Sequence, residues 1–202
     1  MQEDVVTRGE AGHASNQDLS RLEEFQKQID DIKSRLEALG KAVQEDKISM
    51  IVFSGELDKA LAAFVIATGA VAMGMEVVMF FTFWGTPLLR DKNKSVGGKD
   101  FMGKMFGAML PKGFDSLKLS KMNMAGMGTA MMKSLMKKKN VASLDQMIEM
   151  AGELGVKIYV CEMSMDLMGF KREEMISYPN LEFCGVAKFL EEAKNSKVQL
   201  FI

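Results

Sequence analysis

Residues 47–85, KISMIVFSGELDKALAAFVIATGAVAMGMEVVMFFTFWG, decide the fold. Two short β-type runs, ISMIVF at 48–53 and VVMFFTF at 77–83, flank a longer run at 58–73 that is rich in alanine and other small residues. Short apolar runs of β-branched and aromatic residues are typical of strands buried on both faces in a parallel sheet. The stretch therefore predicts a strand, a buried helix and a second strand.

A membrane-spanning helix at 60–85 is the alternative interpretation, because Glu76 is the single charged residue there. A spanning helix needs about 20 consecutive apolar residues. Gly74 and Glu76 interrupt the run and leave a helical piece that is too short, followed by a β-type piece. The sequence therefore favours a helix and a strand over a membrane span.

The same alternation of strands and helices returns after residue 140. A helix is expected at 141–155, with Ser143 as its N-cap and Gly155 at its end. Further strands are expected at 156–160, 181–186 and 198–202, with helical segments beginning near Ser164 and Ala187. Repeated strand–helix alternation predicts an α/β fold with a mainly parallel sheet and helices on both faces.

An N-terminal segment differs in pattern from this α/β part. Apolar residues spaced by three and four form a heptad seam: Leu22, Phe25, Ile29, Ile32, Leu36, Leu39 and Val43. The narrow seam and its charged flanks favour a self-associating coiled coil, and a helix docked on its own domain is the alternative. We therefore expect a flexible leader at 1–18, a heptad helix at 19–46 and an α/β domain at 47–202.

Residues 86–140 interrupt the α/β rhythm and are too long for a plain loop in a compact domain. They hold eleven lysines and nine of the twenty methionines. We interpret them as an insertion with one or two amphipathic helices that covers the strand ends. The methionines favour an adaptable packing surface, while docking to a protein or membrane and copper binding are the alternatives.

Composition excludes several classes of function. The net charge of −1 suggests no nucleic-acid partner. His13 is the single histidine and lies in the polar leader, which argues against Ser–His–Asp or Cys–His catalysis. Two cysteines and one histidine are too few for a structural zinc site. The two cysteines make no disulfide framework and fit a reducing, cytoplasmic setting.

Three loops that follow strands are candidates for the functional site, because ligands gather at the carboxyl ends of parallel strands. They contain Ser54 and Gly55, then Trp84, and finally Cys161 with Glu162 and Met163. A cysteine at a helix start meets free backbone N–H groups and the positive end of the helix dipole, which favour the thiolate. Glu162 opposes this effect, and lysines of the insertion could offset it.

Position alone leaves the role of Cys161 open among a buried structural thiol, a reactive thiol and a copper(I) ligand. Met163 and Met165 would be soft ligands, but residues two apart do not share a helix face. Cys184 precedes Gly185 at another strand-to-helix junction. It is either packed in the core or a second thiol within reach of Cys161.

Three stretches together carry a resemblance to a known family. They are residues 51–85, residues 110–141 (LPKGFDSLKLSKMNMAGMGTAMMKSLMKKKNV) and residues 156–175 (VKIYVCEMSMDLMGFKREEM). Residues 47–202 resemble the DsrE/DsrF-like family, and more narrowly its longer, Met-rich, DsrE-related branch that is often labelled peroxiredoxin-like. The resemblance implies a mainly parallel five-stranded sheet and assembly into homo-oligomers.

The resemblance also implies a role in sulfur trafficking, and we expect no cofactor and no metal. Cys161 corresponds to the cysteine that accepts sulfane sulfur as a persulfide or a thiosulfonate adduct and relays it to a TusA-like carrier protein. The expected protein is thus a cytoplasmic, sulfurtransferase-like sulfur carrier, with Cys184 as a candidate second thiol. A non-catalytic oligomeric scaffold or regulatory subunit with a Met-rich partner-binding face is the alternative, and it predicts an unreactive Cys161.

Overall fold

The computed structural model describes the backbone at residues 16–42 and 45–202 and divides the chain into two compact units, Met1–Val43 and Gln44–Ile202. The first unit contains helix α1 (Asn16–Ala42). Side chains of α1 are described at 19–37, and the apolar seam residues there, from Leu22 to Leu36, are exposed. The flexible leader expected at 1–18 falls mostly outside the described residues, and Asn16 already belongs to α1. The heptad helix was expected to reach residue 46, but Glu45 begins the first strand.

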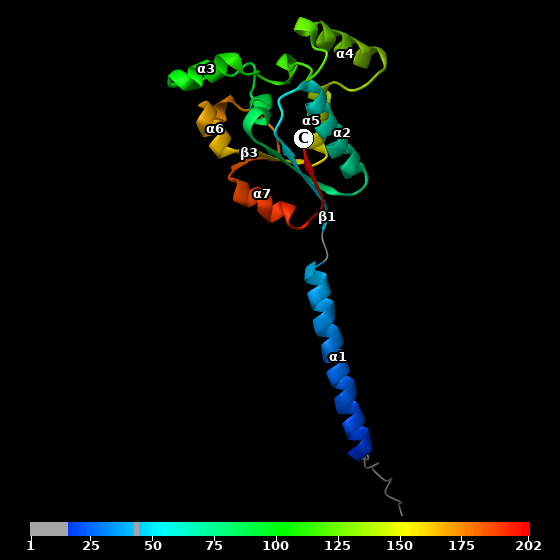
Figure 1. Cartoon of the computed structure of the whole chain (residues 1–202). Coiled ribbons are helices and arrows are strands. Elements are labelled where there is room, and N and C mark those ends of the chain that lie inside the picture. Colours follow the sequence, from blue (N-terminus) through cyan, green and yellow to red (C-terminus); the bar gives the residue numbers. More distant parts are fainter. Residues whose placement is uncertain (1–15, 43–44) are drawn as a thin grey trace, which may run out of the picture. The chain divides into compact units, whose positions relative to one another are not determined.

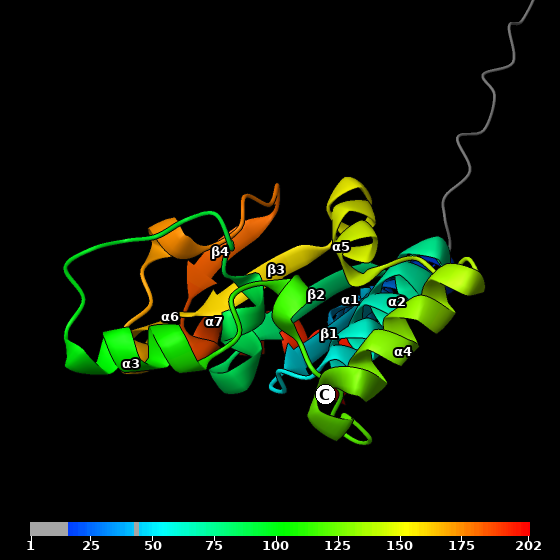
Figure 2. The same ribbon diagram turned by 90° about the horizontal axis from the view of Figure 1, so that it is seen from above.

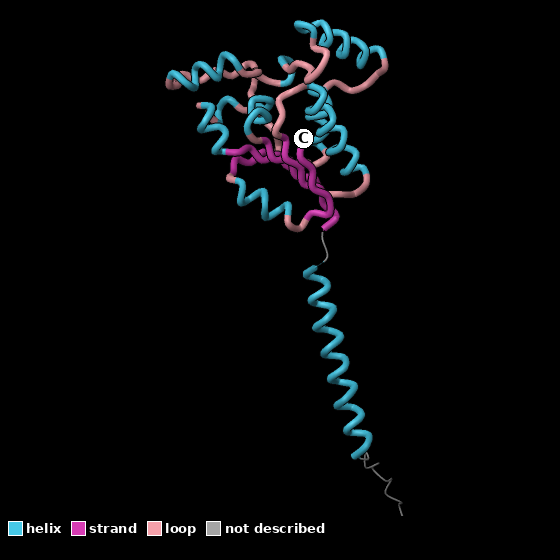
Figure 3. The backbone as a smooth tube through the Cα atoms, in the orientation of Figure 1, coloured by secondary structure: helices cyan, strands magenta, loops and turns pink. Residues whose placement is uncertain are grey.

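Five strands form one sheet in the second unit (Figure 1, Figure 3). They are β1 (Glu45–Val52), β2 (Glu76–Phe81), β3 (Lys157–Cys161), β4 (Leu181–Cys184) and β5 (Ser196–Phe201). Their order is β4-β3-β2-β1-β5, and every neighbouring pair is parallel. The predicted α/β fold with a parallel five-stranded sheet is confirmed. Because all strands run the same way, their carboxyl ends meet at one edge.

Helices cover both faces of the sheet, as predicted. On one face lie α2 (Leu57–Ala72), α5 (Leu144–Glu153) and α6 (Glu162–Met168), which pack with Met50, Val52 and Phe81 in the larger core. The other face carries α7 (Val186–Ala193) and a smaller core around Phe80 and Phe189 (Figure 1). No helix in the described ranges is both long and apolar enough to cross a membrane.

Residues 86–140 leave the sheet edge and return to it. They begin within the 3₁₀ helix η1 (Phe83–Leu89) and contain α3 (Phe101–Met109), the short 3₁₀ turns η2 (Phe114–Ser116) and η3 (Met124–Gly126), and α4 (Met127–Lys138). Figure 1 shows α3 and α4 on the same side of the sheet, and Figure 2 shows them toward opposite ends of the domain. Seven of the nine methionines of this insertion are exposed, and none of the nine belongs to the buried core of the described residues.

A buried ion cluster holds the insertion to the domain. The guanidinium of Arg90 donates to the carbonyl oxygens of Gly107 and Pro111 at 3.2 Å and lies 3.5 Å from Glu174. Lys99 lies 2.5 Å from the same carboxylate, and the Arg90 guanidinium stacks 4.6 Å above the ring of Phe170. Since a buried charge is tolerated only when it is paired, this cluster fixes both ends of α3 relative to the sheet.

Candidate functional site

Cys161 is the last residue of β3 and the N-cap of α6. The apolar run VKIYV forms a strand that is buried at Ile158, Tyr159 and Val160, and the chain turns directly into α6 at Glu162. Cys161 keeps an extended backbone (φ −68°, ψ 110°), and its side chain makes no capping hydrogen bond. The thiol therefore lies at the strand-to-helix junction that the sequence predicted, and it forms no capping hydrogen bond with the helix.

The face on which the thiol lies could not be read from the junction alone. Side chains alternate along a strand, so Cys161 shares a face with Tyr159, whose hydroxyl donates to Glu192 of α7 at 2.8 Å. Cys161 packs in the smaller core with Phe80 and is 3% exposed. The thiol thus faces α7 and not α6, whose Met165 packs in the larger core on the opposite face.

Cys184 is the partner of Cys161 across the β3–β4 pair. It ends β4 as Cys161 ends β3, and it packs in the same small core, where it is 7% exposed. Both thiols are free. Burial, then the nearby carboxylate of Glu182, raises the pKa of the Cys184 thiol to about 11, so this thiol stays protonated at neutral pH. The structure brings the two cysteines together.

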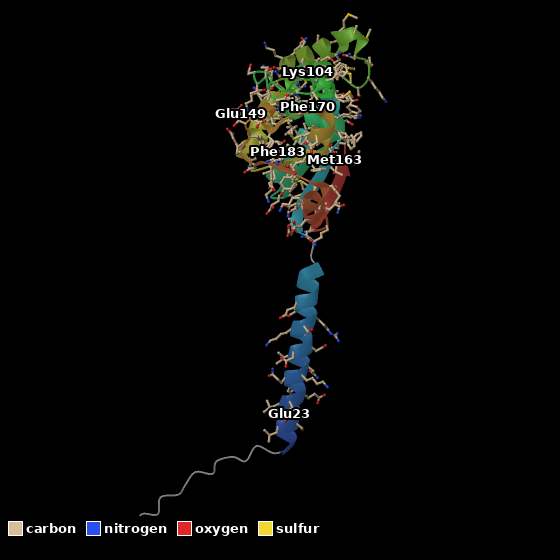
Figure 4. All side chains as sticks on the ribbon, turned by 90° about the vertical axis from the view of Figure 1, so that its left-hand side faces the viewer. Glu23, Lys104, Glu149, Met163, Phe170 and Phe183 are labelled. Atoms are coloured by element: carbon tan, nitrogen blue, oxygen red, sulfur yellow. The ribbon has the colours of Figure 1, made fainter. Side chains whose placement is uncertain are left out.

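Glu162 is paired with Arg172, a residue that no local sequence pattern indicates. The guanidinium of Arg172 forms a salt bridge with the Glu162 carboxylate and lies 5.0 Å above the ring of Phe183, which Figure 4 labels. The cation that offsets Glu162 therefore comes from the segment after α6 and not from the lysines of the insertion. Glu162 and Arg172 also line a hollow of about 480 Å³ beside α6.

Ser54, Gly55 and Trp84 lie in two loops that touch. A Cβ atom on Gly55 would lie 2.6 Å from the carbonyl oxygen of Trp84, so only glycine allows this approach. The hydroxyl of Ser54 accepts a hydrogen bond from Lys59 at 3.1 Å. The close approach of Gly55 to Trp84 joins the loop after β1 to the start of η1.

A buried serine joins the loop after β2 to α6. The hydroxyl of Ser164 lies 2.9 Å from that of Thr82 and accepts the backbone N–H of Phe83 at 2.9 Å. Phe83 has a positive φ of 43°, which is rare for a bulky residue and often marks a functional site. A polar residue on an otherwise apolar helix face was the sequence signal for Ser164, but its partners are 82 and 81 positions away.

Exposed apolar side chains surround the same sheet edge. Trp84 follows β2, Met163 follows β3, Val186 follows β4 and Phe201 ends β5, and all four are exposed. Figure 4 labels Met163 on α6. Parallel strands place these four residues at the carboxyl edge of the sheet, where Cys161 also lies, and they form an apolar rim there.

The described residues contain no group of three or more His, Cys, Asp or Glu placed to hold a metal ion. His13 lies outside them.

The fold and this edge define a class: an open α/β domain with a parallel sheet that presents a strand-end cysteine beside a second thiol. Residues 44–201 match the model of the DsrE/DsrF/DrsH-like family, and the chain belongs to this family. It is 47% identical over 159 residues to the uncharacterized protein YrkE of Bacillus subtilis, covering 79% of this chain and 98% of that protein. It is 38% identical over 161 residues to the sulfur carrier protein DsrE2 of Allochromatium vinosum, covering 79% of this chain and all of that protein.

Proposed function

We propose that this protein carries sulfane sulfur or a thiosulfonate group on Cys161 and passes it to a TusA-like carrier protein. The position of Cys161 at the end of β3, in a domain 38% identical to a protein named as a sulfur carrier, is the observation that carries the proposal. Because the described cysteines are both free thiols, they also fit a reducing, cytoplasmic compartment.

Two exchange steps accomplish this transfer. The Cys161 thiolate attacks the outer sulfur of a persulfide donor, or the sulfane sulfur through which an S–SO3 group is bound to the donor's cysteine. In both cases the donor's thiolate leaves with the electron pair of the broken S–S bond. The acceptor's thiolate then attacks the sulfur held on Cys161, and Cys161 leaves as a thiolate. Each step exchanges one S–S bond for another, so the carrier needs neither a cofactor nor an external oxidant.

The surroundings of Cys161 suit a carrier that must hold a labile group. Its 3% exposure keeps an adduct away from bulk thiols. The salt bridge from Arg172 removes much of the repulsion that Glu162 would exert on a thiolate or a charged adduct. Access requires movement at the rim, where Met163 and Val186 are exposed immediately after the two cysteine-bearing strands.

The charge distribution favours an acidic protein partner. Residues 86–140 hold twelve basic and three acidic residues, a net charge of +9, whereas the rest of the chain has a net charge of −10. Helix α3 of this insertion packs against α6, the helix that Cys161 caps. A basic surface beside the thiol's strand end would steer an acidic carrier toward it, at a rate that falls with salt. The same positive charge of residues 86–140 would also attract an anionic membrane.

The exposed seam of α1 favours a homo-oligomer. Phe25, Ile29 and Ile32 repeat at heptad spacing and are exposed. A second copy of the chain presents the same seam, so a coiled coil would bury both. Ile29→Lys should lower the mass measured by sedimentation equilibrium, whereas Lys33→Arg should not. An unchanged mass in Ile29→Lys would contradict this assembly.

The test of the sulfur-carrier proposal is intact mass after incubation with polysulfide or tetrathionate. The wild-type chain should gain an adduct, and Cys161→Ser should not. Cys184→Ser is the matched control because it removes the neighbouring thiol, and it should still gain the adduct. Equal labelling of Cys161→Ser and the wild type would refute the role of Cys161.

Burial of Cys161 favours a second candidate, a non-catalytic scaffold that binds partners through its Met-rich face. Seven exposed methionines of residues 86–140 support such a surface. The rate of thiol alkylation in the native protein separates the two candidates. A carrier should react at Cys161 without unfolding, whereas a scaffold should be protected until denaturant is added.

A further inference from the structure

The geometry of the two cysteines carries an inference beyond transfer to a partner. Cys161 and Cys184 are directly paired residues on neighbouring parallel strands, with side chains in one small core. Neighbouring strands lie about 4.8 Å apart. Disulfides join residues whose Cα atoms lie about 4.4–6.8 Å apart. The backbone therefore already holds the pair within the range that a disulfide bridges.

We propose that Cys184 is a resolving thiol that discharges a persulfide on Cys161 as sulfide. This inference rests on the proposed function, because it needs Cys161 to hold sulfane sulfur. It gives the protein a second outcome: sulfur that finds no acceptor leaves as sulfide, and the two cysteines are joined across β3 and β4.

The step balances without an external oxidant. The sulfur of Cys184, on losing its proton, attacks Sγ of Cys161 and forms the disulfide. The bond between that Sγ and the outer sulfur breaks, and its electron pair leaves with the outer sulfur, which takes up the proton as hydrosulfide. The outer sulfur is reduced by two electrons, and the two cysteines are oxidised by two. A low-molecular-weight thiol then returns the disulfide to two thiols.

The surroundings of Cys184 make this discharge slow. Burial raises the pKa of the thiol first, followed by Glu182 on the same strand face, then Cys161 and Glu162, while Lys188 of α7 acts in the opposite direction. With a pKa of about 11, only about one molecule in 10⁴ carries the thiolate at pH 7. The low thiolate fraction slows the discharge and so favours transfer to a partner.

Most of the other ionisable groups near this small core are either uncharged or paired with an opposite charge near neutral pH. Tyr159 has a raised pKa because it is buried and hydrogen-bonded to Glu192, so it stays uncharged. Glu192 forms a salt bridge with Lys47 at 2.9 Å, and Glu162 forms one with Arg172. Glu182 has no salt bridge among the described residues, which makes it the carboxylate to neutralise in a test.

The experiment loads the full chain with inorganic polysulfide, removes the excess, and follows intact mass and free sulfide at pH 8. The wild type should gain one sulfur atom, then lose it together with two hydrogen atoms and release one sulfide per chain. Cys184→Ala should load to the same extent but keep the sulfur, which also shows that its site is folded. Glu182→Gln should speed the release.

The direction of the Glu182→Gln effect follows from thiolate chemistry. Loss of the Glu182 charge should lower the pKa of Cys184 and give more thiolate, and the weaker nucleophilicity of a more acidic thiol offsets only part of that gain, so release should be faster than in the wild type. Glu153→Gln, an exposed carboxylate on α5, is the matched control and should release at the wild-type rate.

Two results would overturn the inference while leaving the carrier intact: release from Cys184→Ala at the wild-type rate, or loss of sulfur from the wild type without the disulfide mass. A chain that gains no sulfur at Cys161 would instead refute the carrier proposal. Oxidised glutathione gives a readout that needs no loading, since it should form the Cys161–Cys184 disulfide in the reduced wild type. Failure of that disulfide to form, while both thiols can be alkylated, would also overturn the pairing.

Discussion

Replacing Glu174 by glutamine should destabilise the α/β domain by about 4 kcal/mol, because breaking a buried ion pair costs roughly 3–5 kcal/mol. The Glu174 carboxylate is 2% exposed and lies between two cations, at 2.5 Å from Lys99 and 3.5 Å from Arg90. Glutamine keeps the size of the side chain and can still accept the backbone N–H of Lys171, now at 3.1 Å. The substitution therefore removes only the negative charge of Glu174, and it leaves Lys99 and Arg90 without their carboxylate partner.

The assay is urea unfolding monitored by circular dichroism. Glu173→Gln is the matched control, because this neighbouring carboxylate is exposed, and its free energy of unfolding should change by less than about 0.5 kcal/mol. The Glu174→Gln variant should also be cut faster by trypsin at lysines of residues 86–140, since the cluster fixes that insertion. A loss below about 1 kcal/mol, with an unchanged m-value, would refute the reasoning that this cluster depends on charge.

Three further predictions concern the sheet and its edges. Gly85→Ala should abolish folding or lower the free energy of unfolding by several kcal/mol, since its Cβ would lie 2.1 Å from a carbonyl oxygen of β1. Gly69→Ala in α2 is the control, because its Cβ would lie in open space. In the same urea assay this control should stabilise the protein by about 0.5–1 kcal/mol. Lys47→Met should lower the free energy of unfolding by about 2 kcal/mol and should make stability depend less on pH in acid. Burial alone would raise the pKa of Glu192, but hydrogen bonds from Lys47 and Tyr159 lower it. The stabilisation is therefore present above about pH 4.5 and is lost as the pH falls. Ser164→Ala should cost about 1–3 kcal/mol in thermal unfolding, because it leaves a buried hydroxyl and a backbone N–H without their partner; a melting temperature equal to that of the wild type would contradict that role.

The secondary structure could be predicted because its signals are local. The β-type runs at 48–53 and 77–83 became β1 and most of β2, although β2 ends at Phe81, where the chain turns into η1. Ser143 caps α5 with the reciprocal hydrogen bonds of a capping box. The end of the heptad helix was placed too late, because the charged residues between Val43 and Lys47 fit both a helix end and a strand start.

The site was predicted in part for the same reason. The junction of β3 and α6 identified Cys161 as a strand-end cysteine, since a strand followed by a helix is visible in the local pattern. Arg172 and Ser164 were missed. A polar residue on an apolar helix face marks Ser164 as unusual, but no local pattern identifies the partners Thr82 and Phe83 of Ser164 or the partner Glu162 of Arg172.

The sequence by itself determined an α/β fold, a separate heptad helix, and a cysteine where a strand ends, because side-chain periodicity and helix caps act over a few residues. Only the tertiary structure decided that Cys161 faces α7, that Cys184 lies directly across from it, and that burial raises the pKa of the second thiol. Those facts depend on strand order and register, and a shift of one residue in a strand would turn either thiol to the opposite face of the sheet.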